Sequence, residues 1–318
     1  MVGLGGAKVG VLMVLVSAVS FGFMPIFARL AYAQGVGVDE LLFIRFLFAF
    51  LIMGVLLAAS RHLIVPRIRE LLFLIVLGAL AYFLQSTLYF TALIYSPVAL
   101  VALLLYTYPV LVTIGAFGLG WEKISGRLAG AVAIALLGLL LVANPFGNPI
   151  GFGVFLAFGS AVTYTVYILS GSKVLRTVRG DVAAFYVMGA ASFSFGLAGE
   201  VAGTVHLNWS LIGWFWVGMI TVLCTVIAIT AFFIGISKIG PSRAALISIV
   251  EPATSIFASV WLFGNALNAL QWFGGLLILV ATVITALYGN PEPRLETNLR
   301  TKQKEPLREG EIPGLKRT

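Results

Sequence analysis

The chain has 318 residues, of which 60% are hydrophobic and only 10% are charged, and its mean hydropathy is +1.07. Soluble globular proteins carry roughly 25% charged residues, so this composition excludes an ordinary soluble protein and indicates an integral membrane protein. The single cysteine, Cys224, excludes a disulfide within the chain and a cysteine metal cluster. The net charge of +8 comes from basic residues in short loops and a tail, so we take it as a topology signal and expect no nucleic-acid partner.

Ten apolar segments of membrane length follow one another along the chain. Crossing ~30 Å of hydrocarbon takes about 20 apolar residues in a helix. The predicted helices cover residues 9–31, 40–60, 71–93, 97–119, 126–144, 150–170, 182–204, 211–236, 241–263 and 269–289. The first of them follows Lys8 and could be taken for a secretory signal, but its apolar run is too long, so we expect it to be retained.

The two halves of the chain are related by a repeat with an offset of 143 residues. Ser17–Ser20 (SAVS) recurs as Ser160–Thr163 (SAVT), and Pro109 recurs as Pro252. Since each half holds five spans, the halves would lie in the membrane in opposite orientations, an arrangement found in many secondary transporters. The alternative is two unrelated runs of similar composition. We predict an all-α polytopic membrane protein with ten transmembrane helices in two inverted five-helix repeats, residues 1–146 and 147–289.

Lysine and arginine occur almost entirely in alternate loops, which predicts the orientation because positive loops stay in the cytoplasm. The basic residues of these loops are Lys8, Arg61, Arg67, Arg69, Lys123, Arg127, Lys173, Arg176, Arg179, Lys238 and Arg243. We expect a multi-pass protein of the cell (cytoplasmic) membrane with both termini inside. Residues 290–318 contain seven basic and five acidic residues and few apolar ones, which predicts a disordered cytoplasmic tail. Contact of this tail with anionic lipid is the alternative.

Prolines interrupt the fourth helix of each repeat. Pro109 and Pro252 each remove a backbone hydrogen bond and leave a carbonyl free, so we expect kinks that face protein or a cavity rather than lipid. Glu251, just before Pro252, lies close to the bilayer centre. A carboxylate at that depth is costly, which predicts binding of a cationic or amine group, or of a proton. Prolines tolerated without a function, and a structural glutamate bonded to a neighbouring helix, are the alternatives.

Polar side chains line single faces of two other predicted helices. Tyr82, Gln85 and Tyr89 are spaced by three and four residues on the third helix, and Tyr164 and Tyr167 follow Ser160 in the same way on the sixth. Tyr106, Thr107 and Tyr108 precede the kink at Pro109. These faces are expected to turn toward a cavity that suits a small amphipathic metabolite, although hydrogen bonding between helices would also explain them.

Two charged residues lie nearer the outer surface. Arg45 is some six residues inside the second helix, where its side chain either extends to the lipid headgroups or contacts a substrate carboxylate. Glu200 lies near the outer end of the seventh helix, which is compatible with an interfacial or a gating role.

Several kinds of site are missing from the sequence. It contains no phosphate-binding glycine loop, and its two histidines, His62 and His206, fall near opposite surfaces. No pair of aspartates lies within the membrane, as an intramembrane prenyl-transfer enzyme would need. We therefore expect no cofactor, no metal and no enzymatic activity.

With these features the chain resembles the drug/metabolite transporter superfamily and, within it, the EamA-like branch of ten-helix transporters. The resemblance covers about residues 9–289. It is carried by the segments Ser96–Ala99, Tyr108–Pro109, Trp121–Glu122, Gly240–Leu246, Glu251–Pro252, Gly264 and Gln271–Leu276, and by Arg45 within Phe43–Phe46. Where the second half of this family usually has a glutamate after the glycine that ends helix 9, this chain has Asn265.

The resemblance implies a carrier for small organic metabolites, often an exporter, with a central cavity between the repeats. We predict an alternating-access secondary transporter in the lipid bilayer, a monomer or homodimer, with amino acids as the first candidate substrates. Its predicted substrate site consists of Glu251, Tyr82, Gln85, Tyr89, Tyr108, Tyr164 and Tyr167, with Arg45 as an outer auxiliary and kinks at Pro109 and Pro252. A channel, a receptor-type membrane protein and an intramembrane enzyme are the alternatives.

Overall fold

The computed structural model describes residues 4–119, 126–143, 151–174, 177–204, 206–239, 247–248, 250–264 and 267–288. In these ranges the regular secondary structure is entirely helical. The first half contains α1 (Leu4–Tyr32), α2 (Val38–Ala59), α3 (Ile68–Val76), η1 (Leu77–Tyr82), α4 (Phe83–Tyr95), α5 (Val98–Leu105), α6 (Tyr108–Gly118) and α7 (Gly126–Ala143). The second half contains α8 (Phe152–Val174), α9 (Gly180–Ala202), α10 (Leu211–Thr221), η2 (Val222–Ile227), α11 (Ala228–Ile239), α13 (Val250–Phe263) and α14 (Ala269–Tyr288).

Every one of the ten predicted segments contains helix, which confirms the all-α membrane fold. Six helical stretches are long and apolar enough to cross a membrane, and they are the first three of each half. Shorter apolar helices follow at the fourth and fifth positions of each half. Some predictions fall outside the described residues. They concern the beginning of the predicted helix 241–263, the tail 290–318, and the residues Glu122, Lys123, Arg176, Arg243 and Asn265.

The third helix of each repeat contains a π-helical segment at nearly the same place. Shifting η1 by the repeat offset puts it on residues 220–225, which overlaps η2 over four positions. A π-helical turn interrupts the regular hydrogen-bond ladder and is frequent at functional sites. The two repeats therefore share an irregularity of the backbone that their side-chain sequences do not reveal.

The fourth helix of each repeat is interrupted just before its proline, because Tyr106 and Thr107 lie in a turn before α6 and Ser248 lies in a turn before α13. In the first repeat α5 ends at Leu105 and α6 begins at Tyr108, so Pro109 is the second residue of a new helix. In the second repeat α13 begins at Val250 and contains Pro252 in its first turn. Proline is tolerated there because the first amides of a helix have no partner within it. Each expected kink is thus a break followed by a half-helix.

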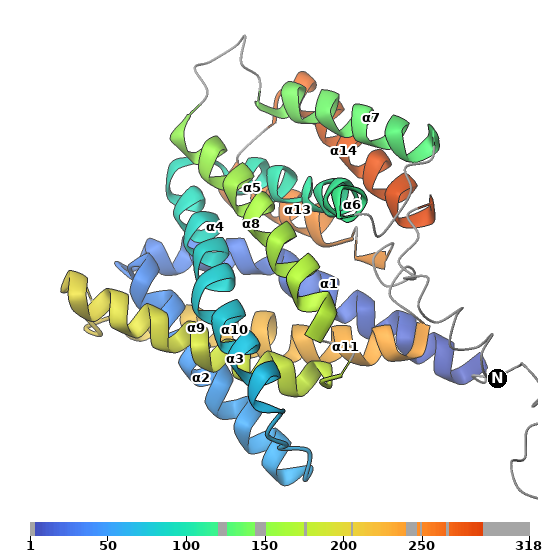
Figure 1. Cartoon of the computed structure of the whole chain (residues 1–318). Helices are drawn as coiled ribbons and strands as arrows, with labels where there is room; N and C mark the ends of the chain where they lie inside the picture. The colour runs from blue at the N-terminus through green and yellow to red at the C-terminus, as the bar shows by residue number, and fades with distance from the viewer. Residues whose placement is uncertain are drawn as a thin grey trace, which may run out of the picture.

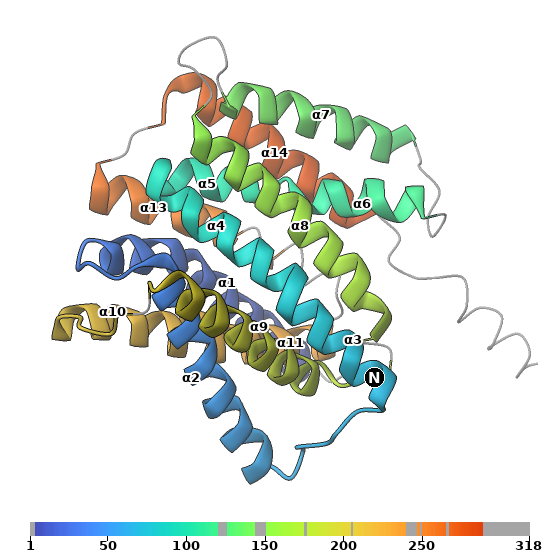
Figure 2. The same cartoon turned by 60° about the vertical axis from the view of Figure 1, so that its left-hand side comes forward.

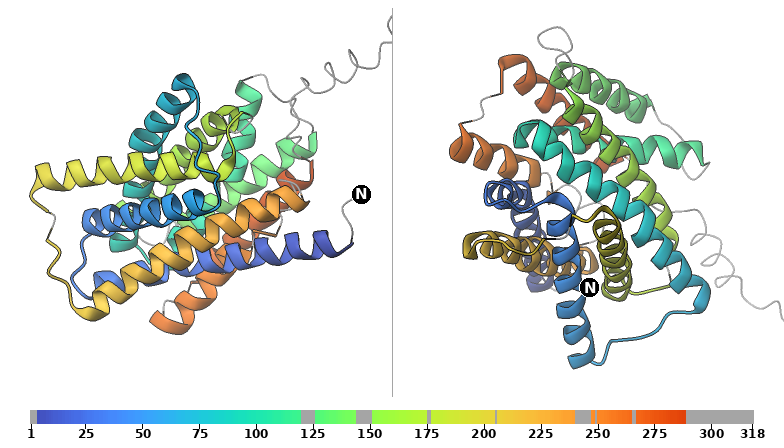
Figure 3. Two further views of the ribbon diagram at one scale, coloured as in Figure 1. Left: turned by 90° about the horizontal axis from the view of Figure 1, so that it is seen from below. Right: turned by 90° about the vertical axis from the view of Figure 1, so that its left-hand side faces the viewer.

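The two repeats interlock through equivalent contacts. The fifth helices, α7 and α14, pack along each other, and so do the second helices, α2 and α9 (Figure 1). The first helix of each repeat packs against the third and fourth helices of the other: α1 lies on α10, η2, α11 and α13, and α8 lies on η1, α4, α5 and α6 (Figure 2). In the view from below, α2 lies against α9 and α10, and α10–α11 lies against α1 (left panel of Figure 3).

Glycines allow two of these helix pairs to approach closely. A Cβ atom on Gly22 of α1 would lie 2.6 Å from Thr254 Cβ and 2.8 Å from the Glu251 carbonyl oxygen of α13. A Cβ atom on Gly138 of α7 would lie 2.7 Å from the Gly274 carbonyl oxygen of α14. Small residues take this role in membranes because lipid tails provide no hydrophobic force that would push helices together.

A buried carboxylate joins two connections at one end of the bundle. Glu40, in the first turn of α2, accepts hydrogen bonds from the Gly37 amide (2.9 Å), the His206 amide (2.6 Å) and the Trp209 indole nitrogen (3.0 Å). It caps the N-terminus of α2 and holds the α9–α10 connection against the α1–α2 connection. By the predicted orientation this is the outer end.

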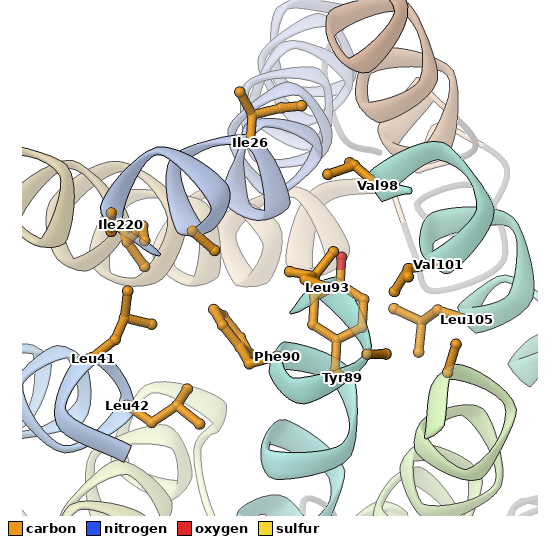
Figure 4. Close-up of a cluster of buried hydrophobic side chains, with 14 of the residues drawn as sticks. Ile26, Leu41, Leu42, Tyr89, Phe90, Leu93, Val98, Val101, Leu105 and Ile220 are labelled. Carbon is orange, nitrogen blue, oxygen red and sulfur yellow. The ribbon is translucent and has the colours of Figure 1, made fainter. Parts of the chain in front are cut away.

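The central core is formed where α4 meets both repeats. Tyr89, Phe90 and Leu93 project from α4 among side chains of α1, α2, α5 and α10 (Figure 4). Phe90 lies on the side of Leu41 and Leu42, whereas Tyr89 lies on the side of α5. The third helix therefore connects the α2 region to the broken fourth helix.

Candidate functional site

The broken fourth helices are tied to each other by one tyrosine hydroxyl. Tyr106, in the turn between α5 and α6, lies 2.8 Å from the Ser248 carbonyl oxygen and 3.0 Å from Oε2 of Glu251. Tyr106 is 3% exposed, and Glu251 is half-buried. A contact between residues 145 positions apart thus joins the helix break of one repeat to that of the other.

The position of Pro252 explains why Ser248 needs this partner. Proline at position 252 cannot donate a hydrogen bond to the carbonyl four residues earlier, which belongs to Ser248. That carbonyl instead accepts from the Glu251 amide at 2.9 Å and from Tyr106. An unsatisfied carbonyl within a membrane costs several kcal/mol, so the freed acceptor must be bonded inside the protein.

Glu251 lies at the N-terminal end of a half-helix. It is in the first turn of α13, where the aligned peptide dipoles and the unbonded amides favour a negative charge. Broken helices that point such ends at a central site are common in secondary transporters. Among the described residues Glu251 forms no salt bridge, since the one ion pair there joins Arg179 to Asp181.

Tyrosine rings extend from Glu251 across the first repeat and onto α8. Ring centroids are 5.7 Å apart for Tyr106 and Tyr108, 4.8 Å for Tyr108 and Tyr164, 5.9 Å for Tyr164 and Tyr167, and 4.9 Å for Tyr167 and Tyr82. We call these five residues the tyrosine row. Tyr82, Tyr108, Tyr164 and Tyr167 are all half-buried, so their faces and hydroxyls are not fully used by packing.

The sequence placed Tyr82, Gln85 and Tyr89 on one face, and the structure gives each a different environment. Tyr82 joins the tyrosine row, whereas the Gln85 amide donates to Ser160 Oγ at 3.2 Å, and Ser160 donates in turn to the Gln85 backbone carbonyl. The Gln85 side chain therefore joins α4 to α8 through its hydrogen bond with Ser160. Tyr89 is 3% exposed and lies within electrostatic range of both Arg45 and Glu251.

Arg45 is a buried cation, and the expectation that its side chain extends to the lipid headgroups is wrong. It is 2% exposed, its Nε donates to Thr225 Oγ1 at 2.8 Å, and its guanidinium carbon lies 4.8 Å from the Phe46 ring and 5.3 Å from the Phe90 ring. Cation–π contacts contribute about 0.5–2 kcal/mol each. The penalty for burying a charge is several kcal/mol, so these contacts offset only part of it.

A π-helical turn positions the partner of Arg45. Thr225 lies in η2, and its hydroxyl donates to the Ile220 carbonyl at 3.0 Å while it accepts from Arg45. In a π-helical turn a carbonyl lies close to the residue five positions on, which matches the bond from Thr225 to Ile220. Cys224, next to Thr225, lies within electrostatic range of both Arg45 and Glu251.

Sequence reasoning left Tyr106 and Thr225 out of the predicted site. A signal for Tyr106 existed, because it stands with two other hydroxyl-bearing residues just before Pro109, at the break equivalent to that beside Glu251. No pattern indicated Thr225, which is 180 positions from Arg45. Glu200 is exposed, near the C-terminal end of α9. In the part of the chain that the structure describes, no three His, Cys, Asp or Glu side chains gather in a way that suits a metal ion.

Comparisons with known proteins agree with this architecture. The model of the EamA-like transporter family matches residues 8–144 and again residues 151–287. An uncharacterized transporter of Archaeoglobus fulgidus is 27% identical over 274 residues, 85% of this chain and 94% of that protein. The uncharacterized transporter YcbK of Bacillus subtilis is 27% identical over 284 residues, 84% of this chain and 89% of that protein.

A solved crystal structure shows the same fold, with a TM-score of 0.62 and 20% identity over 87% of this chain and 96% of that chain. The family model covers most of the sequence, once for each repeat, and the two matched ranges contain almost all of the described helical residues of the first and of the second repeat. The chain therefore belongs to the EamA-like transporter family and is a multi-pass membrane transporter of small molecules.

Proposed function

We propose that this transporter is a secondary carrier that exports small organic metabolites, amino acids first among them, by alternating access. Its central site is formed by Glu251 and by the tyrosine row, with Tyr89 and Arg45 beside them. Residues 1–146 and 147–289 act as the two inverted repeats, and both termini lie in the cytoplasm of a cell whose cytoplasmic membrane holds the protein.

The observation that carries the proposal is the hydrogen bond between Tyr106 and Glu251 across the two broken helices. A carrier must expose one site to each side in turn, so the site should lie where the repeats meet and where the backbone can bend. The half-helices α6 and α13 fulfil both conditions, because each begins at a break and belongs to a different repeat.

The side chains favour an organic substrate over a bare ion. Half-buried tyrosine rings offer flat apolar faces together with hydroxyls, which suit a small molecule that is polar at one end. Glu251 supplies a charge that binds an ammonium group or a proton. These properties are compatible with an amino acid that carries an apolar side chain.

The test is efflux from proteoliposomes that contain the purified protein. The vesicles are loaded with equal amounts of several amino acids, sugars and nucleobases, and each compound is measured over time against protein-free vesicles. Saturable loss of one class, faster when the same compound is present outside, is the expected result. Glu251→Gln should abolish this loss, whereas Glu200→Gln, at an exposed position on α9, should leave it unchanged.

Two results contradict the proposal. A flux that rises linearly with concentration and shows no counter-exchange indicates a channel. Efflux that persists unchanged in the Glu251→Gln protein removes this carboxylate from the mechanism.

A further inference from the structure

Arg45 presents an unused hydrogen-bonding edge inside the bundle. Of its three guanidinium nitrogens, Nε bonds Thr225, while Nη1 and Nη2 form no hydrogen bond or ion pair with any described residue. The buried polar atoms that are sealed from solvent and unpartnered are, among the described residues, only the hydroxyls of Ser17 and Ser259. The two terminal nitrogens of Arg45 are therefore not sealed from solvent, although the residue as a whole is only 2% exposed.

The surroundings of Arg45 orient the guanidinium but do not neutralise it. The Phe46 and Phe90 rings flank it, and Thr225 fixes Nε, so the group is held rigidly. Within the described residues no carboxylate lies within salt-bridge distance of it. A guanidinium that is buried and held in this way, but lacks an anion, is ready to bind a carboxylate with its two parallel N–H groups.

Arg45 and Glu251 have two neighbours in common. Tyr89 and Cys224 each lie within electrostatic range of both charges, although the two charges do not form a salt bridge. The other titratable groups nearest Glu251 are Tyr106, Tyr108 and Tyr164. A cation and an anion thus act on the same tyrosine, and among the described residues they form no salt bridge with each other.

We propose that Arg45 binds the carboxylate and Glu251 the ammonium group of an α-amino acid zwitterion, with Tyr89 between them and the tyrosine row around the substrate side chain. This inference rests on the proposed function and gives the substrate class of the same site. Arg45 is then a central ligand rather than an outer auxiliary. A zwitterion pairs both charges, whereas a simple amine leaves Arg45 unpaired and a simple carboxylate leaves Glu251 unpaired, and an unpaired buried charge is costly.

Three ligands that differ only in their charged groups test the proposal on the unaltered protein. L-phenylalanine carries both groups, phenethylamine lacks the carboxylate, and 3-phenylpropionate lacks the ammonium group. Each ligand is titrated into the purified full-length protein in detergent. Its binding is measured from the rise in the protein's thermal unfolding midpoint with ligand concentration. We expect L-phenylalanine to bind at least ~10-fold more tightly than either analogue, because one buried charge stays paired only with the zwitterion.

Variants then assign each charge to its residue. Arg45→Gln should weaken L-phenylalanine at least ~10-fold and leave phenethylamine unchanged, because the amine makes no use of Arg45. Binding of phenethylamine also shows that the variant is folded, and Arg45→Lys provides a second protein that keeps the charge. Arg179→Gln is the matched control, since Arg179 is exposed and bonded to Asp181.

The proposal is overturned if Arg45→Gln weakens all three ligands equally, or if the wild-type protein binds an analogue as tightly as L-phenylalanine. Proteoliposomes separate this failure from failure of the carrier itself. Saturable efflux of a sugar or nucleobase, without binding of L-phenylalanine, refutes the zwitterion site and leaves the carrier intact. The absence of any saturable efflux contradicts the carrier.

Discussion

At the helix break of the first repeat Tyr108 precedes Pro109, and at the equivalent place in the second repeat Glu251 precedes Pro252. The same kind of difference recurs around the site. Several polar residues line the proposed site from the first-repeat helices and from α8, which packs on them. At the equivalent positions of the other repeat, 143 residues away, stand residues of another type. The pairs are Arg45 and Met188, Tyr82 and Thr225, Gln85 and Ala228, Tyr164 and Phe21, and Tyr167 and Met24.

The backbones of the repeats, by contrast, agree closely. Both contain a π-helical segment in the third helix, a break in the fourth and a close contact between their fifth helices. In the proposed carrier, a symmetric backbone would let two gates move in equivalent ways, and an asymmetric lining would give the substrate one preferred orientation. The repeats therefore share these backbone features, whereas the polar side chains of the proposed site are distributed unequally between them.

The largest effect is expected when Glu251 is replaced by the residue at the equivalent position. Glu251→Tyr makes the two breaks alike and removes the acidic group, so transport should fall by about 100-fold, equivalent to roughly 3 kcal/mol. The initial rate of efflux from proteoliposomes measures the loss. Glu200→Gln is the control. A rate for Glu251→Tyr within a factor of two of wild type would show that the asymmetry at position 251 has no role in transport.

A smaller effect is expected at the closest contact between α1 and α13. Gly22→Ala forces its Cβ atom against Thr254 and the Glu251 carbonyl, whereas the equivalent position of the second repeat carries Thr165. Overpacking of this kind costs about 1–3 kcal/mol. We expect a lower thermal midpoint in detergent, together with slower transport. Gly118→Ala is the control because nothing lies within 4 Å of its Cβ position; equal midpoints for the two variants would contradict the tight approach.

Loss of the Tyr106 hydroxyl tests the link between the two breaks. Tyr106→Phe keeps the ring but removes the hydroxyl, whose single proton is shared between the Ser248 carbonyl and Glu251, a loss of about 1 kcal/mol. Transport should fall by about tenfold, and the thermal midpoint should fall slightly. Tyr95→Phe, at an exposed residue near the end of α4, is the matched change. If both variants transport equally well, the contact across the breaks is not used.

The smallest effect compares two serines at equivalent positions. Ser160 bonds Gln85, whereas Ser17 is buried without a hydrogen-bond partner among the described residues, and Ala228 stands at the place equivalent to Gln85. Ser160→Ala should therefore lower the free energy of unfolding by about 1 kcal/mol, while Ser17→Ala should leave it unchanged or raise it slightly. Thermal midpoints of both variants, measured side by side, check the difference in sign. Equal destabilisation would mean that Ser17 is bonded as well.

Reasoning from the sequence located the helices better than it described the site. Apolar length gave all ten segments, and the spacing of Ser17 and Pro109 from their counterparts gave the repeat. The prolines were expected to bend continuous helices, but the structure begins new helices at both. A proline is compatible with either arrangement, and the choice depends on whether neighbours satisfy the freed carbonyl, as Tyr106 does for Ser248.

Arg45 shows the limit of local reasoning most clearly. Its depth in the second helix is compatible with extension to the headgroups and with a buried position. Phe90 and Thr225 decide between them, and they come from other helices. Likewise, three-residue spacing placed Gln85 beside Tyr82, but only the packing of α8 showed that Ser160 occupies the Gln85 amide.

The sequence by itself determined that this chain crosses a membrane, where its apolar helical segments lie and that its halves repeat. Those properties are local, because a helix satisfies its own backbone and its apolar length must match the bilayer. The tertiary structure decided which polar groups meet: Tyr106 with Glu251, Gln85 with Ser160, and Arg45 with Thr225. Such pairs join residues from 75 to 180 positions apart. Their identity depends on how helices pack and where they break, which the spacing of residues within one helix does not specify.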